Sequence, residues 1–467
     1  MTKEGTDRLK KGIILLFIAN LINLVISLIN GFVLPKYLPI ETYANIKIYN
    51  LYASYIGVLA LGYSDGIYLK YGGYNINDIS ERELNIGKSN IIVFQFLISL
   101  MFVAFAFVIK DFVLLLTTIS VVPVNTVALY KNIFQATGEF KTYSRIMNYT
   151  SIFTFIGTMT LLFCVKTYNP YYYIGIMIFV TYVVWAIMEY KLKSVYHKKS
   201  KFILSVKQLF ENIRSGIVLM LGNFSSIMMT SVDRWFVKFL LTKADFAYYS
   251  FVVSTETLVT VFINPIVTTM YNYICVINDY KAVNRIKKMC IIFAIFLISG
   301  AFPIKFILEV YLTKFIKANY VLFILFASEI FFMIIKGIYV NIYKARKQQD
   351  RYFKQLVIVI IIGCIFNTIF YALLKSNEGI AFGTLLSVFC WYIMCCISVD
   401  EIKPDFSEII TLLICIPSFI LSGFFLPAVL GFILYISIMV IVCLLFMRSE
   451  FCMLLNMGIG IIRKRFS

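Results

Sequence analysis

The sequence predicts an all-α integral membrane protein with fourteen transmembrane helices. Hydrophobic residues make up 61% of its 467 residues and charged residues only 14%, and the mean hydropathy is +0.86. Soluble domains are less apolar and more charged. The apolar runs are continuous and close to the roughly 20 residues that a helix needs to cross a bilayer. A membrane β-barrel would instead show short segments of alternating polarity.

The fourteen runs follow one another with short connections, none of which is long enough to fold as a catalytic domain. In order, they are Ile13–Leu34, Ala44–Tyr63, Ile91–Ile109, Phe112–Phe134, Ile146–Val165, Tyr171–Tyr190, Ile217–Leu241, Ala247–Ile277, Cys290–Leu312, Tyr320–Tyr343, Leu356–Leu374, Ile380–Val399, Ile409–Leu426 and Val429–Met447. We expect the first twelve to form two parallel six-helix lobes, to which the last two helices are appended. The predicted parts are an N-lobe (1–190), a basic cytoplasmic linker (191–213), a C-lobe (214–400), and the last two helices with a cytoplasmic tail (401–467).

An internal sequence match supports the two lobes. The segments YKNIFQATGEFKTY, starting at Tyr130, and YVNIYKARKQQDRY, starting at Tyr339, align without a gap and share five of fourteen residues. The sixth and twelfth runs, starting at Tyr171 and Ile380, have the same separation along the chain. Because six is an even number, both copies would enter the membrane in the same orientation. Such repeats are typical of transporters.

The distribution of charge predicts the orientation. Most of the 43 Lys and Arg residues lie in the N-terminal segment, the even-numbered connections and the C-terminal tail. Basic segments stay on the cytoplasmic side of the membrane, so both termini are predicted to be cytoplasmic. We attribute the formal charge of +19 to attraction between these segments and anionic membrane lipids, and we expect no nucleic-acid partner.

The sequence lacks the motifs of the main enzyme classes. It contains no GxxxxGK[ST] phosphate loop, no GxGxxG after a strand and no HExxH, so we expect no nucleotide-dependent catalysis and no cofactor. Its single histidine, His197, lies among lysines in the linker and lacks the partners of a general base. The ten cysteines fall almost wholly within the apolar runs, and we predict neither disulfides nor a metal site.

Charged residues at membrane depth are the candidate functional residues, because each costs about 2.5–3.5 kcal/mol to insert. The densest group is Asp233, Arg234 and Lys238 in the seventh run. Arg234 and Lys238 are four residues apart and share a helix face. An arginine keeps its charge, so at depth it needs an anion or an aqueous cavity, and its planar fork suits phosphate oxygens.

Five further charged residues extend this set: Lys47 and Asp65 in or next to the second run, Glu256 in the eighth, and Glu329 and Lys336 in the tenth. We expect Lys47 and Lys336 to bind substrate with Arg234 and Lys238, and the four acids to serve in coupling or charge pairing.

Several of these residues also have a purely structural interpretation. Lys47, Lys238 and Asp65 lie near helix ends, where snorkelling or a solvated boundary would explain them. Glu256 and Glu329 can be neutral or paired with a cation on another helix.

Several segments resemble one known family. They are Leu34-Pro-Lys-Tyr-Leu-Pro, Leu61-Gly-Tyr-Ser-Asp-Gly, Gln135-Ala-Thr-Gly-Glu-Phe-Lys-Thr-Tyr, and Ser231-Val-Asp-Arg-Trp-Phe-Val-Lys-Phe-Leu followed by Ala247-Tyr-Tyr-Ser. In this order the chain resembles the polysaccharide-export branch of the multidrug/oligosaccharidyl-lipid/polysaccharide (MOP) superfamily, the Wzx-type lipid-linked oligosaccharide flippases.

The resemblance implies a function in the bacterial cytoplasmic membrane. Such a protein moves an undecaprenyl-diphosphate-linked oligosaccharide, the repeat unit of a surface polysaccharide, from the inner to the outer leaflet by alternating access of two lobes around a cationic cavity. At the matching positions, Arg234 would contact the diphosphate or an acidic sugar, with Asp233 as its partner or as a coupling site. H⁺ or Na⁺ gradients or the membrane potential would supply the energy, and a glycan polymerase and glycosyltransferases are possible partners.

Two alternatives remain within the same superfamily. One is a multidrug or cation antiporter, although the first run carries no charged residue between Ile13 and Leu34 that would suit cations. The other is a flippase for lipid II or a teichoic precursor. The sequence leaves the glycan and the coupling ion open.

Overall fold

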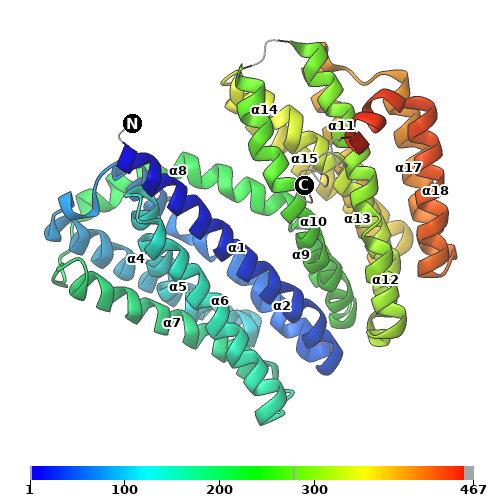
Figure 1. Cartoon of the computed structure of the whole chain (residues 1–467). Helices are drawn as coiled ribbons and strands as arrows, with labels where there is room; N and C mark the ends of the chain where they lie inside the picture. The colour runs from blue at the N-terminus through cyan, green and yellow to red at the C-terminus, as the bar shows by residue number, and fades with distance from the viewer. Residues whose placement is uncertain (1–2, 277–278, 457–467) are drawn as a thin grey trace, which may run out of the picture. The chain divides into compact units, whose positions relative to one another are not determined.

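The computed structural model describes residues 3–276 and 279–456, and within these ranges every regular element is a helix. The chain divides into two compact units, Met1–Ile227 and Met228–Ser467, which are described in turn (Figure 1). Ile277, the predicted end of the eighth run, and the tail from residue 457 onward lie outside the described residues. The finer limits predicted for the lobes and the linker stay predictions.

The first unit contains the helices of the N-terminal half. They are α1 (Lys3–Tyr37), α2 (Ile40–Ser54), α3 (Tyr63–Lys70), α4 (Glu81–Ile109), α5 (Phe112–Ala136), α6 (Phe140–Thr160), α7 (Pro170–Ser194) and most of α8 (Val206–Met229), with short segments η1 (Ile56–Ala60), η2 (Ile76–Asp78) and η3 (Leu161–Val165).

The second unit contains the remaining helices. They are α9 (Val232–Leu240), α10 (Lys243–Val276), α11 (Tyr280–Ile298), α12 (Ala301–Val310), α13 (Asn319–Ile334), α14 (Val340–Ala345), α15 (Gln349–Leu374), α16 (Asn377–Ser398), α17 (Phe406–Phe425) and α18 (Ala428–Phe446), with η4 (Thr313–Ala318), η5 (Ile335–Tyr339) and η6 (Asp400–Ile402).

The helices confirm the predicted class of fold. In the described part of the chain, twelve helices are long and apolar enough to cross a membrane, and α8 with α9 would supply a thirteenth that is bent by 52°. The protein is therefore an all-helical, multi-pass membrane protein. Two of the fourteen predicted runs, the second and the seventh, are broken rather than continuous.

The second run, predicted as one helix over Ala44–Tyr63, ends early as a regular helix. α2 stops at Ser54, the chain passes through η1, and α3 begins at Tyr63. Between them Leu61 and Gly62 adopt left-handed backbone angles, with φ of 49° and 82°. A right-handed helix cannot continue through two such residues. Hydropathy could not show this break, since Leu61 is as apolar as its neighbours.

The seventh run, predicted over Ile217–Leu241, is divided between α8 and α9 at Thr230 and Ser231. The end of the predicted linker, from Val206 onward, already belongs to α8.

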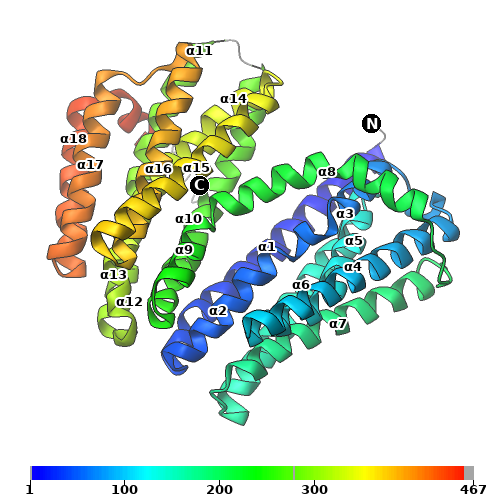
Figure 2. The ribbon, with the colours of Figure 1, turned by 180° about the vertical axis from the view of Figure 1, so that it is seen from behind.

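One helix lies at the centre of each unit. α5 contacts α2, α3, α4, α6 and α7, and α13 contacts α10, α11, α12, α16 and α17. Nearly every residue of α13 is buried, and Figures 1 and 2 show it inside its bundle. The matched segments occupy comparable places, because Tyr130 is buried near the end of α5 and Tyr339 is buried just after α13.

The linker is fastened to α4 by polar side chains. After α7 its backbone runs without regular structure over residues 199–205, and side chains of α4 bond to every second residue of this stretch. These hydrogen bonds join Asn85 to Lys199 and Lys201, Ser89 to Ile203, and Asn90 to Ser205. The linker therefore forms a fixed strap along α4, which the sequence did not reveal.

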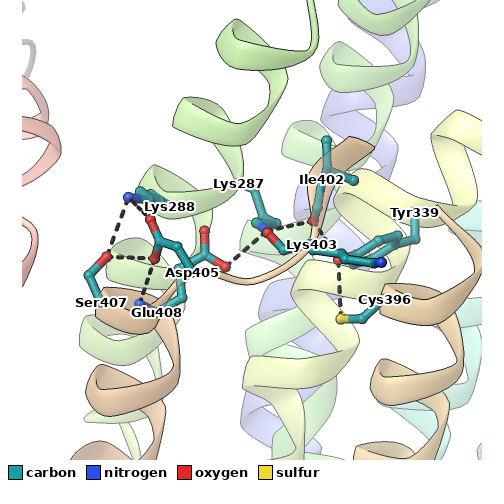
Figure 3. A network of polar contacts seen from close by, with 9 residues as sticks. All are labelled: Lys287, Lys288, Tyr339, Cys396, Ile402, Lys403, Asp405, Ser407 and Glu408. Atoms are coloured by element: carbon teal, nitrogen blue, oxygen red, sulfur yellow. Dashed lines mark hydrogen bonds and ion pairs between the residues drawn. The ribbon is translucent and has the colours of Figure 1, made fainter. Parts of the chain in front are cut away.

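Buried lysines fasten both ends of α17 to the second unit. At its N-terminus, Lys287 of α11 forms an ion pair of 2.9 Å with Glu408, and neither side chain is exposed. Figure 3 shows the Lys287 ammonium also donating to the backbone oxygen of Ile402, at 2.8 Å. At the C-terminus, Lys305 of α12 donates to the backbone oxygens of Gly423 and Leu426, at 2.7 and 2.6 Å.

Next to this pair, Lys288 pairs with Asp405, the N-cap residue of α17 (Figure 3). Burial raises the pKa of Asp405, but hydrogen bonds from Lys288 and Ser407 outweigh it and hold the pKa at about 2. The carboxylate is therefore charged at neutral pH and caps the positive end of α17.

Candidate functional site

The first turn of α9 holds Asp233 as a buried acceptor. Its side chain is 7% exposed. One carboxylate oxygen accepts a hydrogen bond of 2.7 Å from the backbone N–H of Arg234, and the other accepts one of 2.7 Å from the hydroxyl of Tyr249 on α10. These bonds fix the carboxylate where the bent α8–α9 segment restarts as a helix.

Arg234 is the neighbouring cation, and it is only partly satisfied by the protein. Its Nη2 lies 3.5 Å from the backbone oxygen of Thr230, which is a weak contact at the limit of hydrogen bonding. Its Nε is buried without a hydrogen-bond partner. A guanidinium with unused donors can receive oxygens of a phosphate or carboxylate.

The second unit brings five of the eight candidate residues together. The charged groups that act on the Glu256 carboxyl of α10 are those of Glu329, Asp233, Arg234 and Lys336. Glu329 belongs to α13 and is 7% exposed. We name these five residues the charge cluster; it draws on α9, α10, α13 and η5.

Lys336 of the charge cluster lies in a π-helical turn and next to an aromatic ring. It lies in η5, where a π-helical turn interrupts the helix that begins with α13. Its Nζ lies 4.6 Å from the centre of the Phe332 ring. Such turns often occur at functional sites, and the aromatic face stabilises the cation.

Lys238 lies one turn beyond Arg234 on α9. Its Nζ lies 4.6 Å from the ring centre of Phe239 and 5.7 Å from that of Trp235, and the two rings are stacked with centres 5.4 Å apart. The predicted cationic face of α9 therefore carries an aromatic platform as well.

A small polar cavity lies against Asp233. Its accessible volume is about 10 Å³, and its lining includes Asp233, Asn367 of α15, and Thr384 and Ser387 of α16. Asn367 is completely buried, and neither amide atom of its side chain has a hydrogen-bond partner. The volume suits one water molecule or one small cation. The carboxylate, amide and hydroxyl oxygens are ligands that a hard cation accepts.

Lys47 and Asp65 belong to the first unit. Lys47 of α2 is half-buried, and its Nζ lies 5.2 Å from the ring centre of Tyr43. Asp65 of α3 lines a polar pocket with residues of α5 and α8. Both residues therefore belong to a different compact unit from the charge cluster.

Three groups near the charge cluster were missed in the sequence: Tyr249, Asn367 and Thr384. Asn367 gave one usable signal, since it is an amide in the middle of the apolar run Leu356–Leu374. Tyr249 and Thr384 could not be singled out, because tyrosine and threonine are common in membrane helices and neither is charged.

Comparisons with known proteins show which fold the chain has. No family model matches the sequence, and no curated protein matches it. Solved structures do match. The lipid II flippase MurJ in an inward closed conformation aligns with a TM-score of 0.69 and 16% identity, over 93% of this chain and 99% of MurJ.

A second similar structure is a multidrug resistance MATE family transporter of the MOP superfamily in an inward-facing conformation. It aligns with a TM-score of 0.57 and 12% identity, over 82% of this chain and 98% of that transporter. The chain therefore has the fold that these two proteins share.

Proposed function

We propose that the protein is a flippase that moves an undecaprenyl-diphosphate-linked oligosaccharide across the bacterial cytoplasmic membrane. Arg234 carries the proposal, because it is a permanent cation at membrane depth whose buried Nε has no protein partner. A diphosphate headgroup cannot cross hydrocarbon unless protein groups replace its water. In this mechanism Arg234 binds the diphosphate, and Lys238, Lys336 and Lys47 add positive charge along its path.

The carboxyl groups of the second unit would couple this movement to an ion gradient. Glu256 and Glu329 act on each other electrostatically, and two neighbouring carboxylates of equal charge repel, so the pair suits the binding of a proton. The cavity between Asp233 and Asn367 suits a small cation such as Na⁺ instead. Asp65 is the corresponding acid of the first unit, and coupling by it is part of the same proposal.

The remaining parts of the proposal concern direction and partners. With both termini cytoplasmic, transport proceeds from the inner to the outer leaflet, toward the side where a polymerase would use the product. Glycosyltransferases on the cytoplasmic side would supply the substrate. Lipid II and teichoic precursors share the polyprenyl chemistry, and the fold similar to MurJ keeps such a substrate as the second candidate.

A multidrug or cation antiporter is the other candidate, and one observation favours it. The charge cluster contains three acids, Asp233, Glu256 and Glu329, against two bases. Organic cations would bind to such a cluster if substrate approached its carboxyl side.

A flipping assay with reconstituted protein tests the proposal. Vesicles would carry a fluorescent undecaprenyl-diphosphate-linked sugar in one leaflet, and its protection from a membrane-impermeant quencher would report flipping. We expect Arg234→Ala to reduce the rate at least tenfold and Arg234→Lys to restore part of it, because a lysine keeps the charge but loses the planar fork. The control is Arg214→Ala, whose arginine is exposed on α8.

Two results would contradict the proposal. Flipping by Arg234→Ala at the normal rate would remove Arg234 from the mechanism. Transport of an organic cation such as ethidium, without flipping of the lipid-linked sugar, would favour the antiporter.

A further inference from the structure

The first unit contains a second polar pocket, distinct from the charge cluster. It has an accessible volume of about 220 Å³ and lies among the segment Gly57–Asp65, the middle of α5 and the last turns of α8. The broken second run forms one wall, which includes Ser64 and Asp65 at the start of α3. All lining residues belong to the first unit.

Close contact packs α3 against α8, and both helices contribute residues to this pocket. Gly66 of α3 lies directly on the backbone of α8, where a Cβ atom would be 2.0 Å from the backbone oxygen of Asn212. A Cβ atom on Gly216 would be 2.0 Å from the backbone oxygen of Gly62. The next two turns of α8 then place Asn223 and Phe224 along the pocket.

Two buried polar atoms in the pocket have no hydrogen-bond partner. Asn125 is 1% exposed; its Nδ2 donates to the backbone oxygen of Ile56 at 3.1 Å and to Gln95 at 2.6 Å, whereas its Oδ1 is buried without a partner. The Ser64 hydroxyl is also buried without a hydrogen-bond partner. Asp65 adds a carboxylate, and the amides of Asn132 and Asn223 also line the pocket, so a ligand that carries both donors and acceptors fits these groups.

We propose that this pocket binds one sugar ring of the lipid-linked glycan. The carboxylate of Asp65, the Oδ1 of Asn125 and the hydroxyl of Ser64 accept hydrogen bonds from ring hydroxyl groups, and Phe224 packs against an apolar face of the ring. This inference rests on the proposed flippase function and assigns its sugar specificity to the first unit, apart from the cations of the second unit.

The size of the pocket separates this ligand from a bare ion. A single water molecule or small cation needs a cavity with an accessible volume of about 10–15 Å³, which is close to that of the cavity beside Asp233. At about 220 Å³, the pocket is far too large to coordinate one cation by direct contact. A hydroxylated ring fills more of the space and presents several donors at once, which matches two buried acceptors and a carboxylate.

Binding of two kinds of lipid tests the proposal. Purified full-length protein in detergent would be titrated with undecaprenyl diphosphate, and with undecaprenyl diphosphate that carries one N-acetylglucosamine, N-acetylgalactosamine, glucose or galactose. The wild type should prefer at least one sugar-bearing lipid over the bare diphosphate. Asp65→Asn should reduce that preference about tenfold or more, because it removes a charged acceptor, without changing the affinity for the bare lipid.

A second variant fills the pocket and leaves its polar side chains in place, so that the test does not depend on Asp65→Asn alone. Ala128 of α5 lines the pocket, and Ala128→Leu should abolish the sugar preference while all polar groups remain. The controls are Ala104→Leu, which makes the same change at an exposed position of α4, and Asp78→Asn, which removes an exposed carboxylate of the same unit.

The outcomes separate the two proposals. An unchanged sugar preference in both Asp65→Asn and Ala128→Leu, or no preference in the wild type, would overturn the sugar site. A loss of Na⁺ dependence in Asp65→Asn with the sugar preference intact would overturn it in favour of a hydrated cation. By contrast, an unchanged affinity of Arg234→Ala for the bare diphosphate would count against the flippase mechanism itself.

Discussion

At the scale of single residues, the buried charges of the second unit fall into two kinds. We call Lys287 and Glu408 the closed pair, because the Lys287 cation has a carboxylate and a backbone oxygen as acceptors, although the buried Oε1 of Glu408 has no hydrogen-bond partner. Lys305 likewise donates to a backbone oxygen at the end of α17. Arg234 and the Asp233 cavity instead keep buried polar atoms without partners. Cations that have protein acceptors are expected to stabilise the protein, whereas a cation with unused donors is expected to bind an anionic ligand.

The first prediction concerns the cavity beside Asp233. Asp233→Asn keeps an acceptor for the Tyr249 hydroxyl but removes the charge that would hold a cation. We expect the stimulation of flipping by a Na⁺ or H⁺ gradient to fall at least tenfold in this variant. Asn367→Leu should have the same effect. Asp350→Asn, at an exposed position of α15, serves as the control.

Gradient stimulation that persists in both cavity variants would exclude Asp233 from coupling. Glu256→Gln and Glu329→Gln would then be the informative variants, since their carboxyls form the other candidate site.

The second prediction concerns the stability provided by the closed pair. Lys287→Met leaves Glu408 buried without its cation, which costs about 3–5 kcal/mol when one partner of a buried pair is removed. Lys288→Met breaks the pair with Asp405, in which the side chains are 17% and 43% exposed, and should cost only about 1 kcal/mol or less. Thermal unfolding in detergent would measure both.

Equal losses of thermal stability in the two variants would contradict this ranking. Restoration of stability by Glu408→Gln in the Lys287→Met background would confirm that the uncompensated carboxylate causes the loss.

At the scale of helices, breaks and close contacts determine where the functional residues lie. Asp65, which lines its pocket, follows the break between α2 and α3, and Asp233 lies in the first turn of the helix that follows the break between α8 and α9. In both places a polar residue follows within a few positions of the break. The contact of Gly62 and Gly66 with Gly216 then fixes α8 against α3.

The third prediction tests this contact. Gly216→Ala would place a Cβ atom 2.0 Å from the backbone oxygen of Gly62, and backbone atoms cannot move aside as a flexible side chain can. We expect a clear loss of thermal stability and of the sugar preference. Gly222→Ala is the matched control on the same helix, because its Cβ would meet nothing within 4 Å, and it should be neutral or stabilise by up to about 1 kcal/mol through helix propensity.

A Gly216→Ala protein as stable as the Gly222→Ala protein would show that α8 packs on α3 less closely than the structure indicates.

At the scale of the whole molecule, the distribution of basic residues predicts that both termini are cytoplasmic. The fourth prediction uses single cysteines in a cysteine-free protein. Tyr168→Cys lies between α6 and α7 and should react with a membrane-impermeant thiol reagent in intact cells. Gln349→Cys, at the start of α15, should react only after the membrane is opened. The reverse pattern would invert the predicted topology and with it the direction of transport.

Hydropathy and charge predicted the class of fold well, because both report the cost of placing groups in hydrocarbon. Twelve of the runs correspond to unbroken or gently bent spans. The two broken runs escaped detection, since a left-handed backbone at Leu61 or a restart at Val232 leaves the hydropathy unchanged. Charge also singled out Arg234, Asp233, Glu256, Glu329 and Lys336 before their proximity was known.

The sequence by itself thus determined that this chain is a multi-pass helical membrane protein. It also showed that charged residues lie at membrane depth, where their insertion cost calls for a functional or structural explanation. Only the tertiary structure decided which charges are closed pairs, as for Lys287, and which are open, as for Arg234. It also decided that Asn367 and Asn125 keep buried amide atoms without partners. The physical reason is that insertion cost depends on a residue's type, whereas the satisfaction of its hydrogen bonds depends on neighbours distant in sequence.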